Sequence, residues 1–411
     1  MYRFLHSADW QLGARFSQFG ARGAKLRAAR LTTLKKVLDL ARTEAVDAFF
    51  VAGDLFEDNQ VDDALVTTVV DLFSDYPTLP IFVLPGNHDP FTGPDSVWQR
   101  RTWLKVPSHV RVLTEPGVTP LAPDVFLLAS PLQQKLSTLD PSLKLVALAS
   151  ALPSTAIKIG LTHGALAIEG KHQPNDFPIA LNAATRAGLD YLGVGHWHNW
   201  LSETDGGRIV MPGTPEPDRF GNDRAGNVAL VEIEAPGHLP RVRAIPVAYV
   251  EWHPLTFDFA NAMASRSSLE QIFARLSPHP ERTVVRVTMT GTVSPQPLTE
   301  TNAWLDEKLA PFLVGQKQDR TALALTGAEL DDLGRRHPLL TQILADVDRM
   351  ELLATGQSSA AAAQPSSVSP LTLAEAQFVL APSKIELSRL TVSDFAQLRQ
   401  HLLRTLQEIA P

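Results

Sequence analysis

Cysteine is absent from this sequence of 411 residues. Its absence excludes disulfide bonds, thiolate catalysis and every zinc or iron–sulfur site that is built on cysteine. No run of 18 apolar residues occurs, and the first residues lack the long apolar stretch of a signal peptide, so neither a membrane span nor secretion is expected. A cytoplasmic protein is therefore the expectation.

An excess of positive charge is also absent. With 44 acidic and 37 basic side chains the net charge is −7, which gives the chain no overall attraction for nucleic acid. Any binding of DNA or RNA must then come from a local basic patch. The 44% hydrophobic and 20% charged residues are those of an ordinary globular protein, which excludes fibrous and disordered classes. At roughly 150 residues per domain, the length predicts two or three domains.

The first two hundred residues repeat one pattern, in which a short apolar run is followed closely by Asp, Asn or His. Such runs are typical of strands buried on both faces, and a helical spacing of apolar residues lies between the first two runs, at positions 31–41. Alternating strands and helices predict an α/β layered domain, in which ligands bind beyond the carboxyl ends of the strands. The runs and their polar residues are Phe4–Leu5 with Asp9, Phe49–Ala52 with Asp54, Ile81–Leu84 with Asn87 and His88, Ile157–Leu161 with His163, and Tyr191–Val194 with His196 and His198.

The sequence pattern changes beyond Asn227. Apolar and polar residues alternate at 228–233 and 284–289, as in half-buried strands, and a helix between them is expected to begin after Ser267, with Glu270 completing a capping box. We expect the chain to be organised as a domain at 1–235, a small α+β appendage at 240–295, a helical region at 300–353, a linker at 354–370 rich in Ala, Ser, Gln and Pro, and a tail at 371–411.

The polar residues that follow the apolar runs are candidate metal ligands. Asp9 with Gln11, Asp54, Asn87, His163, and His196 with His198 offer oxygen and imidazole donors, which together suit manganese, iron or zinc better than calcium. Two cations roughly 3.5–4 Å apart need an anionic bridge, for which Asp54 is the candidate. Glycines at 53, 86 and 195 leave room for the backbone to approach the ions. One such residue alone is more often a cap or a surface residue, but five at successive strand ends favour a shared site.

Three strings carry a resemblance. In this order, residues 53–54 (Gly-Asp), 86–89 (Gly-Asn-His-Asp) and 195–198 (Gly-His-Trp-His) resemble the calcineurin-like metallophosphoesterases. The longer strings at 6–13 and 53–56 resemble the SbcD-type DNA repair nucleases and the YhaO-like exonucleases, and residues 211–215 are similar to the turn that leads to a capping domain in that family. The resemblance covers about 1–230. It implies a metallophosphoesterase β-sandwich flanked by helices, with 240–295 as a capping domain and a helical C-terminal tail.

The resemblance also implies two divalent metal ions, with Mn²⁺ as the expected ion. At position 11 the family usually has His, whereas Gln is neutral and a weaker donor, so we expect an active site with weaker binding of the first ion. The implied ligands of the first ion are Asp9, Gln11, Asp54 and His198, and those of the second are Asp54, Asn87, His163 and His196.

His88 follows a candidate ligand without being one itself. We expect His88 to stabilise the phosphate or to protonate the leaving oxygen, and Asp89 to orient His88 through a hydrogen bond. The alternative is that His88 is a structural residue at a strand end.

A basic segment follows the Asp9 loop. Positions 15–42 contain eight Lys or Arg residues and one Asp, whereas 43–99 contain no Lys or Arg. This segment is expected to bind DNA phosphates near the metals, although a solvated helix face explains the charges equally well. Tryptophans 10, 98, 103, 197 and 200 are further candidates, for stacking on unpaired bases, although core packing is the commoner role. The residues expected to bind DNA are Arg15, Arg22, Lys25, Arg27 and Arg30.

These observations predict a metal-dependent DNA nuclease, expected to be an exonuclease that hydrolyses phosphodiester bonds in repair or recombination. Two alternatives stay open: a phosphodiesterase or phosphatase acting on small nucleotides or phosphoproteins, and a non-catalytic DNA-tethering subunit whose metal site is impaired at Gln11. The expected partners are DNA, an SbcC-like coiled-coil ATPase and a second copy in a homodimer, with no membrane. An amphipathic tail helix at 392–409 is expected either to dock onto that ATPase or to fold back on its own core.

Overall fold

The computed structural model describes residues 1–324 and, beyond them, 335, 343, 345–348, 350–351, 391 and 394–401. The chain divides into two compact units. The first consists of Met1–His253, His279–Val285 and Pro311–Val314, and the second of Pro254–Pro278, Arg286–Ala310 and the described residues from Gly315 onwards.

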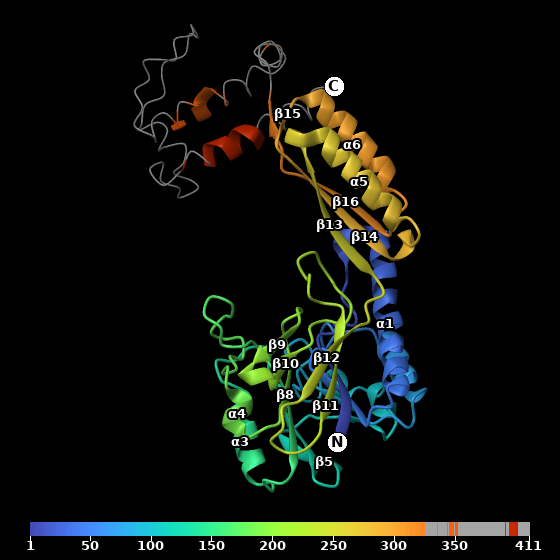
Figure 1. Cartoon of the computed structure of the whole chain (residues 1–411), viewed down its shortest axis with the longest axis vertical. Helices are drawn as coiled ribbons and strands as arrows, with labels where there is room; N and C mark the ends of the chain where they lie inside the picture. The colour runs from blue at the N-terminus through green and yellow to red at the C-terminus, as the bar shows by residue number, and fades with distance from the viewer. Residues whose placement is uncertain are drawn as a thin grey trace. The chain divides into compact units, whose positions relative to one another are not determined.

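Two six-stranded sheets form the first unit (Figure 1). The strands of one sheet are Tyr2–Ser7 (β1), Ala48–Ala52 (β2), Ile81–Leu84 (β3), Val110–Val112 (β4), Asn227–Ile233 (β11) and Arg241–Pro246 (β12), in the order β12-β11-β1-β2-β3-β4. Those of the other are Gly117–Ala122 (β5), Val125–Ser130 (β6), Ile157–His163 (β7), Tyr191–Gly195 (β8), Leu201–Thr204 (β9) and Ile209–Met211 (β10), in the order β5-β6-β7-β8-β10-β9. Strands β1 to β4 are parallel to one another, as are β6, β7, β8 and β10, and the outer strands β11, β12, β5 and β9 are antiparallel to their neighbours.

The two sheets face each other across a shared apolar core. Alternate residues of β1 and β2, such as Phe4 and Phe50, pack inward against Ile159 of β7 and Tyr191 of β8. The ring centroids of Phe4 and Tyr191, which come from different sheets, are 5.2 Å apart. Because the strands are buried on their outer faces as well, their sequences read as continuous apolar runs rather than as alternation.

Helices cover the outer face of each sheet. Helices α1 (Gly23–Thr43) and α2 (Asp63–Ser74) pack on the β1-containing sheet, and α3 (Leu143–Ser150) and α4 (Ala183–Ala187) pack on the other. The apolar spacing at positions 31–41 therefore does form a helix, with Leu34 and Leu38 fully buried. The predicted α/β sandwich of two sheets flanked by helices is confirmed. Among the described residues, no helix is both long enough and apolar enough to traverse a bilayer.

His6 connects the two sheets through a buried hydrogen bond. Its Nδ1 lies 2.7 Å from the Tyr191 hydroxyl, and burial lowers the pKa of His6 from 6.5 to about 3. The unfolded chain therefore takes up a proton between pH 6.5 and 3 that the folded chain does not. We expect the free energy of unfolding to fall by about 2 kcal/mol from this group between pH 7.5 and 5.0. Urea unfolding of the wild type and His6→Asn at both pH values tests this, and equal pH slopes for the two proteins would contradict it.

A smaller sheet has the order β13-β14-β16 and the bounds Glu251–Asp258, Thr283–Thr290 and Val314–Asp319. Helices α5 (Ala262–Leu276) and α6 (Pro295–Leu309) lie side by side (Figure 1), and the rings of Phe273 and Trp304 contact each other at a tilted angle between them. A short pair is formed by β15 (Thr292–Val293) and β17 (Ala322–Leu323). The strand predicted from the alternation at 284–289 is confirmed, whereas the predicted start of the helix is wrong. Helix α5 begins well before Ser267, after a turn at Phe259–Asn261 that the side chain of Asp258 caps.

The helical interpretation of 300–353 is wrong for part of that range. Helix α6 ends at Leu309, and the next described elements are β16 and β17. The strand β16 reads Val-Gly-Gln-Lys-Gln-Asp and lies at a sheet edge, so it lacks the apolar alternation by which strands are recognised.

The linker at 354–370 and most of the tail lie outside the described residues. Within the tail, residues 394–401 are helical. Arg399 of this helix is paired with Asp348 and Glu351, and its Phe395 is buried, which is the arrangement expected when the helix folds back on its own chain.

Candidate metal centre

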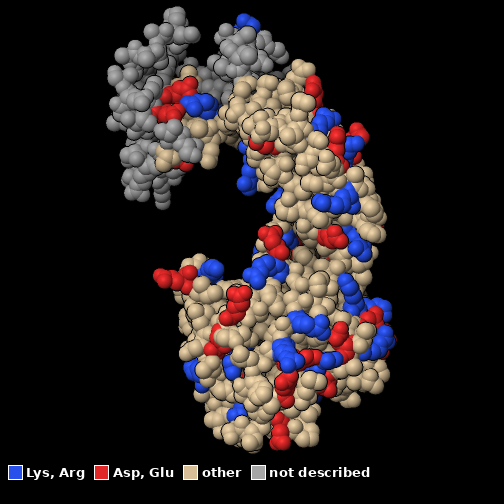
Figure 2. Space-filling view, viewed as in Figure 1, with Lys and Arg blue, Asp and Glu red and all other residues tan. Residues whose placement is uncertain are grey.

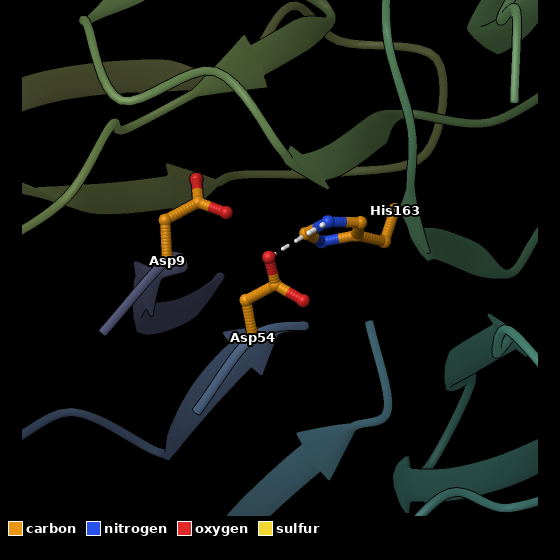
Figure 3. Close-up of side chains that lie close together, drawn as sticks. All are labelled: Asp9, Asp54 and His163. Atoms are coloured by element: carbon orange, nitrogen blue, oxygen red, sulfur yellow. Dashed lines mark ion pairs between the residues drawn. The ribbon is translucent and has the colours of Figure 1, made fainter. Parts of the chain in front are cut away.

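Three buried side chains converge where strands of the two sheets end. Asp9 follows β1, Asp54 follows β2 and His163 ends β7, and one ligand atom of each lies within 4.8 Å of the others. Figure 3 shows the two carboxylates and the imidazole directed toward a common space. The Nε2 atom of His163 is 3.5 Å from Oδ2 of Asp54.

Two further loops reach the same place. The amide oxygen of Asn87, after β3, is 2.8 Å from Nε2 of His163 and 3.0 Å from Nδ1 of His196, after β8. The backbone N–H of His196 donates to both carboxylate oxygens of Asp9. The structure thus joins residues that lie nearly two hundred positions apart in the sequence.

Each imidazole is held through one nitrogen, which leaves the other for a ligand. Nδ1 of His163 donates to the carbonyl of Ala52 at 2.8 Å. Nε2 of His196 lies 2.8 Å from a carboxylate oxygen of Asp176, and Nδ1 of His198 lies 3.1 Å from one of Asp218. Such partners fix the tautomer and the orientation of metal-binding histidines.

Asp176 and Asp218 are functional candidates that the sequence analysis missed. Both lie in loops without the pattern of an apolar run followed by a polar residue, and Asp176 comes from the segment between β7 and α4. The one available signal was the general requirement that a ligand histidine has a second partner.

The backbone is strained at the candidate ligands. Asp9, Gln11, Asp54 and His196 have φ values of 56°, 46°, 55° and 119°, which are uncommon for residues other than glycine. Each such residue costs on the order of 1 kcal/mol or more, and such strain clusters at functional sites because the surrounding structure enforces it.

Glycine is required where the loops meet. A Cβ on Gly53, whose φ is +89°, would lie 2.7 Å from Cγ of His163, and one on Gly86 would lie 2.9 Å from Cγ of Asp54. The room predicted at these positions is therefore occupied by the candidate ligand side chains.

Opposite charges are stabilised within the site. Burial opposes ionisation of Asp54 and protonation of His163, but their mutual interaction outweighs burial: the pKa of Asp54 is lowered and that of His163 is raised to about 9. Burial likewise opposes ionisation of Asp218, but the His198 imidazole, whose Nδ1 lies 3.1 Å away, prevails and lowers the pKa of Asp218 to about 2. Because Nε2 of His163 faces Asn87 and Asp54, a metal ion that binds there must displace the His163 proton.

The donor set fits a divalent metal ion. It combines carboxylate oxygens, an amide oxygen and imidazole nitrogens, the mixture that borderline cations such as Mn²⁺, Fe²⁺ or Zn²⁺ take. The side-chain oxygen of Gln11 is buried without a hydrogen-bond partner, while its amide nitrogen donates to Oδ2 of Asp54 at 2.9 Å. An unpaired buried oxygen beside two carboxylates is a further group that a cation would satisfy.

His88 lies beside this centre. Its backbone N–H donates to Oδ1 of Asp54 at 2.9 Å, its ring Nδ1 to the carbonyl of Glu57 at 2.8 Å, and the ring lines a cavity of about 790 Å³ together with Gln11 and His198.

The predicted orientation of His88 by Asp89 is wrong. The Asp89 carboxylate accepts from the backbone N–H groups of Gly86 and Phe56, at 2.7 and 2.9 Å, and so ties the loop after β3 to the loop after β2. Burial and the charge of Asp54 raise the pKa of Asp89 to about 7.

The basic segment divides into exposed and buried residues. Arg15, Arg22, Lys25 and Arg27 are exposed. Arg30 is 1% exposed and donates to the carbonyl of Trp10, so the prediction that Arg30 binds DNA is wrong.

The tryptophans divide in the same way. Trp10, Trp98 and Trp103 are buried in the core, whereas Trp197 and Trp200 are partly exposed and line the 790 Å³ cavity.

A two-sheet α/β unit with carboxylates and imidazoles converging at its strand ends is an arrangement that could hold a divalent metal ion. Residues 2–200 match the family described as calcineurin-like phosphoesterase. The matched residues include Asp9, Asp54 and His163, which form a candidate site for a divalent metal ion.

Solved structures that match part of this chain include TT1561 of Thermus thermophilus, 15% identical over 60% of this chain and 99% of that one, with a TM-score of 0.40. A dimetal phosphatase from Danio rerio is 13% identical over 59% of this chain and 98% of its own, with a TM-score of 0.38. A purple acid phosphatase from yellow lupin (Lupinus luteus) seeds is 12% identical over 59% of this chain and 51% of its own, with a TM-score of 0.37.

Replacement of Asp176 by alanine is expected to weaken Mn²⁺ binding by about 10- to 100-fold, because His196 loses the carboxylate that fixes its ring. Isothermal titration of metal-free protein with Mn²⁺ measures this. Asp223→Ala is the matched control, since Asp223 lines the same cavity but is exposed. Equal affinity in Asp176→Ala and Asp223→Ala would contradict an orienting role.

Proposed function

We propose that this protein is a manganese-dependent DNA nuclease that removes nucleotides from strand ends, in repair or recombination. The main observation behind this proposal is that basic residues extend over the surface from the cavity beside the candidate metal centre. Arg15 lines a hollow of about 510 Å³ that shares Glu57, Asp218 and Arg219 with the 790 Å³ cavity. Arg22, Lys25 and Arg27 follow on the exposed surface at the start of α1, and such side chains bind phosphates along a strand.

This basic region is local, which accords with the net charge of −7. On the face shown in Figure 2, Lys and Arg are interspersed with Asp and Glu rather than gathered into one large field. The resemblance of the strings at 6–13 and 53–56 to SbcD-type nucleases supports DNA as the substrate over a small phosphate ester.

The residues have separate roles in the proposed reaction. Asp9, Gln11, Asp54 and His198 would hold one divalent ion, and Asp54, Asn87, His163 and His196 the other. The ions supply neutralisation of the phosphate oxygens and a lowered pKa for the attacking water. With Nδ1 engaged by Glu57, the Nε2 atom of His88 is the one that donates a hydrogen bond or a proton to the reacting phosphodiester.

A nuclease assay tests the proposal. Linear duplex and single-stranded DNA, labelled at one end, are incubated with Mn²⁺, Mg²⁺ or a chelator, with closed circular DNA as the control. We expect progressive shortening of linear DNA with Mn²⁺, no cleavage with chelator and intact circles. Hydrolysis of bis-p-nitrophenyl phosphate without any cleavage of DNA would favour the small-substrate phosphodiesterase, and absence of both activities would favour a tethering subunit.

The presence of glutamine at position 11 leads to a separate prediction about metal affinity. Gln11→His should strengthen binding of the more weakly held ion, on the order of tenfold, because imidazole is a stronger donor than a neutral amide. Titration with Mn²⁺ should show one of two binding steps move while the other stays. If both steps keep their wild-type affinity, Gln11 is not a ligand.

Two partner proposals rest on the tail and on the family resemblance. We propose that residues 371–411 bind a coiled-coil ATPase of SbcC type, and that the protein forms a homodimer. Because Arg399 pairs with Asp348 and Glu351 of the same chain, docking of this helix would require those contacts to be exchanged for contacts with the partner. Pull-down of such an ATPase by the full chain and by a chain ending at 370, together with light scattering, tests both. Failure of the pull-down would leave the folded-back arrangement standing.

A further inference from the structure

The cavity beside the candidate metal centre has a lining that the phosphodiester chemistry does not use. Its volume is about 790 Å³, within the range that holds a nucleotide-sized ligand. One part of its lining belongs to the centre itself, through Gln11, His88, His196 and His198. The rest includes Trp197, Trp200, Lys171, Arg219 and Arg224.

Two loops that line this cavity are fastened to each other. The backbone N–H of Trp200 donates to the carbonyl of Arg224 at 3.1 Å, and the N–H of Arg224 donates to the side chain of Asn199 at 3.0 Å. His198 and Asp218 join the same two loops. The walls are therefore preorganised, so a ligand would lose little affinity to ordering them.

The two tryptophans are anchored yet partly open. Trp197 packs against the core beneath β8, and the indole N–H of Trp200 donates to the hydroxyl of Ser202 at 3.1 Å. Both are partly exposed, unlike Trp10, Trp98 and Trp103. Proteins that bind single strands without sequence preference stack nucleobases on aromatic side chains that are held in place and partly exposed.

Charges around the cavity suit an anionic strand. Lys171, Arg219 and Arg224 are exposed cations on its rim. Of the lining carboxylates, Asp218 lies 3.1 Å from His198 and 3.9 Å from the exposed Arg219. The negative charges of Glu57 and Asp223 offset only part of the charge of the three cations. The rim therefore offers cations to the phosphates that flank a stacked base.

We propose that this cavity is a nucleobase subsite, in which Trp197 and Trp200 stack on a base next to the scissile phosphodiester. A base reaches such a subsite only after it leaves the duplex. The substrate class is therefore a strand end with unpaired nucleotides, which the enzyme engages in preference to a blunt duplex end. This inference rests on the proposed nuclease function for its substrate, but the subsite itself can be tested without cleavage.

The test compares two ligands that differ only in the base. Binding of dAMP and of 2-deoxyribose 5-phosphate to the metal-loaded protein is measured by isothermal titration. Stacking is expected to make dAMP bind about tenfold or more tightly. Trp197→Leu, which keeps apolar packing, should reduce this ratio toward one, whereas Trp197→Phe, which keeps an aromatic face, should retain most of it. Equal binding of the two ligands by the wild type, or an unchanged ratio in both Trp197→Leu and Trp200→Leu, overturns the subsite.

The nuclease assay then separates the two failures. Cleavage of DNA together with equal binding of dAMP and the sugar phosphate leaves the nuclease function standing and removes the subsite. No cleavage of DNA, with a base-dependent ratio that Trp197→Leu abolishes, removes the nuclease function and keeps the subsite. Faster cleavage of a strand with a single-stranded overhang than of a blunt duplex supports the substrate class, and equal rates overturn it.

Discussion

Replacement of His88 by asparagine is expected to lower the turnover rate by about three orders of magnitude while metal content stays at the wild-type level. The ring of His88 is fixed through Nδ1 by the carbonyl of Glu57, which leaves Nε2 for the substrate. Loss of one positioned acid or hydrogen-bond donor typically lowers a rate by 10²- to 10⁴-fold. The backbone bond from residue 88 to Asp54 does not depend on the side chain, so the metal centre should persist.

The measurement pairs kinetics with metal analysis. Turnover of DNA and of bis-p-nitrophenyl phosphate is followed in protein whose metal content is determined on the same sample. His109→Asn is the matched control, because the His109 ring also bonds to a backbone carbonyl but lies just before β4, away from the candidate centre. A variant at position 88 that loses metal would instead place His88 among the ligands.

The strand ends were predictable because burial on both faces leaves an unambiguous signal. The residues after β1, β2 and β3 follow parallel strands of one sheet, and those at the ends of β7 and β8 follow parallel strands of the other, so their side chains meet where the sheets pack. The sequence alone indicates which residues follow the ends of strands. It does not show which oxygen or nitrogen faces which neighbour.

Arg30 was predicted to bind DNA only because it lies in a segment rich in basic residues, and this prediction is wrong. Arg30 lies four residues after Leu26 and four before Leu34, on the buried face of α1, and its guanidinium faces Trp10 rather than solvent. Burial lowers the pKa of Arg30, and the carboxylates of Asp218 and Glu216 oppose that shift. Helical periodicity contained this information, since every third or fourth residue of an amphipathic helix is buried whatever its charge.

Asp89 and Asp176 show a different limit. Asp89 stands beside His88 in the sequence but bonds to the loop after β2, and Asp176 stands twenty residues before His196 but bonds to its ring. Adjacency along the chain suggested the first contact wrongly and gave no hint of the second. Such partners depend on how irregular loops fold over the sheets, for which no periodic signal exists.

Asp54→Asn is expected to abolish measurable metal binding, the largest effect of any single substitution in the centre. Oδ2 of Asp54 contacts both Gln11 and His163, and its Oδ1 accepts from the backbone of His88, so this carboxylate contacts residues from three of the chain segments that form the site. Asparagine preserves its shape and tolerates the φ of 55° at this position, so the variant should fold. What it removes is the negative charge.

Removal of that charge has two consequences that stability measurements separate. The pKa of His163 falls, because Asp54 contributes most to raising it to about 9, with a smaller contribution from Asp9 that remains in the variant. Saturating Mn²⁺ stabilises the wild type by about 2.7 kcal/mol at a hundred times its dissociation constant, whereas the variant should gain nothing. Thermal unfolding with and without Mn²⁺ measures this difference, with Asp58→Asn, a carboxylate further along the same loop, as the control. If Mn²⁺ stabilises the variant as much as the wild type, Asp54 is not a shared ligand. The metal ions would then be held by Asp9 and the histidines instead.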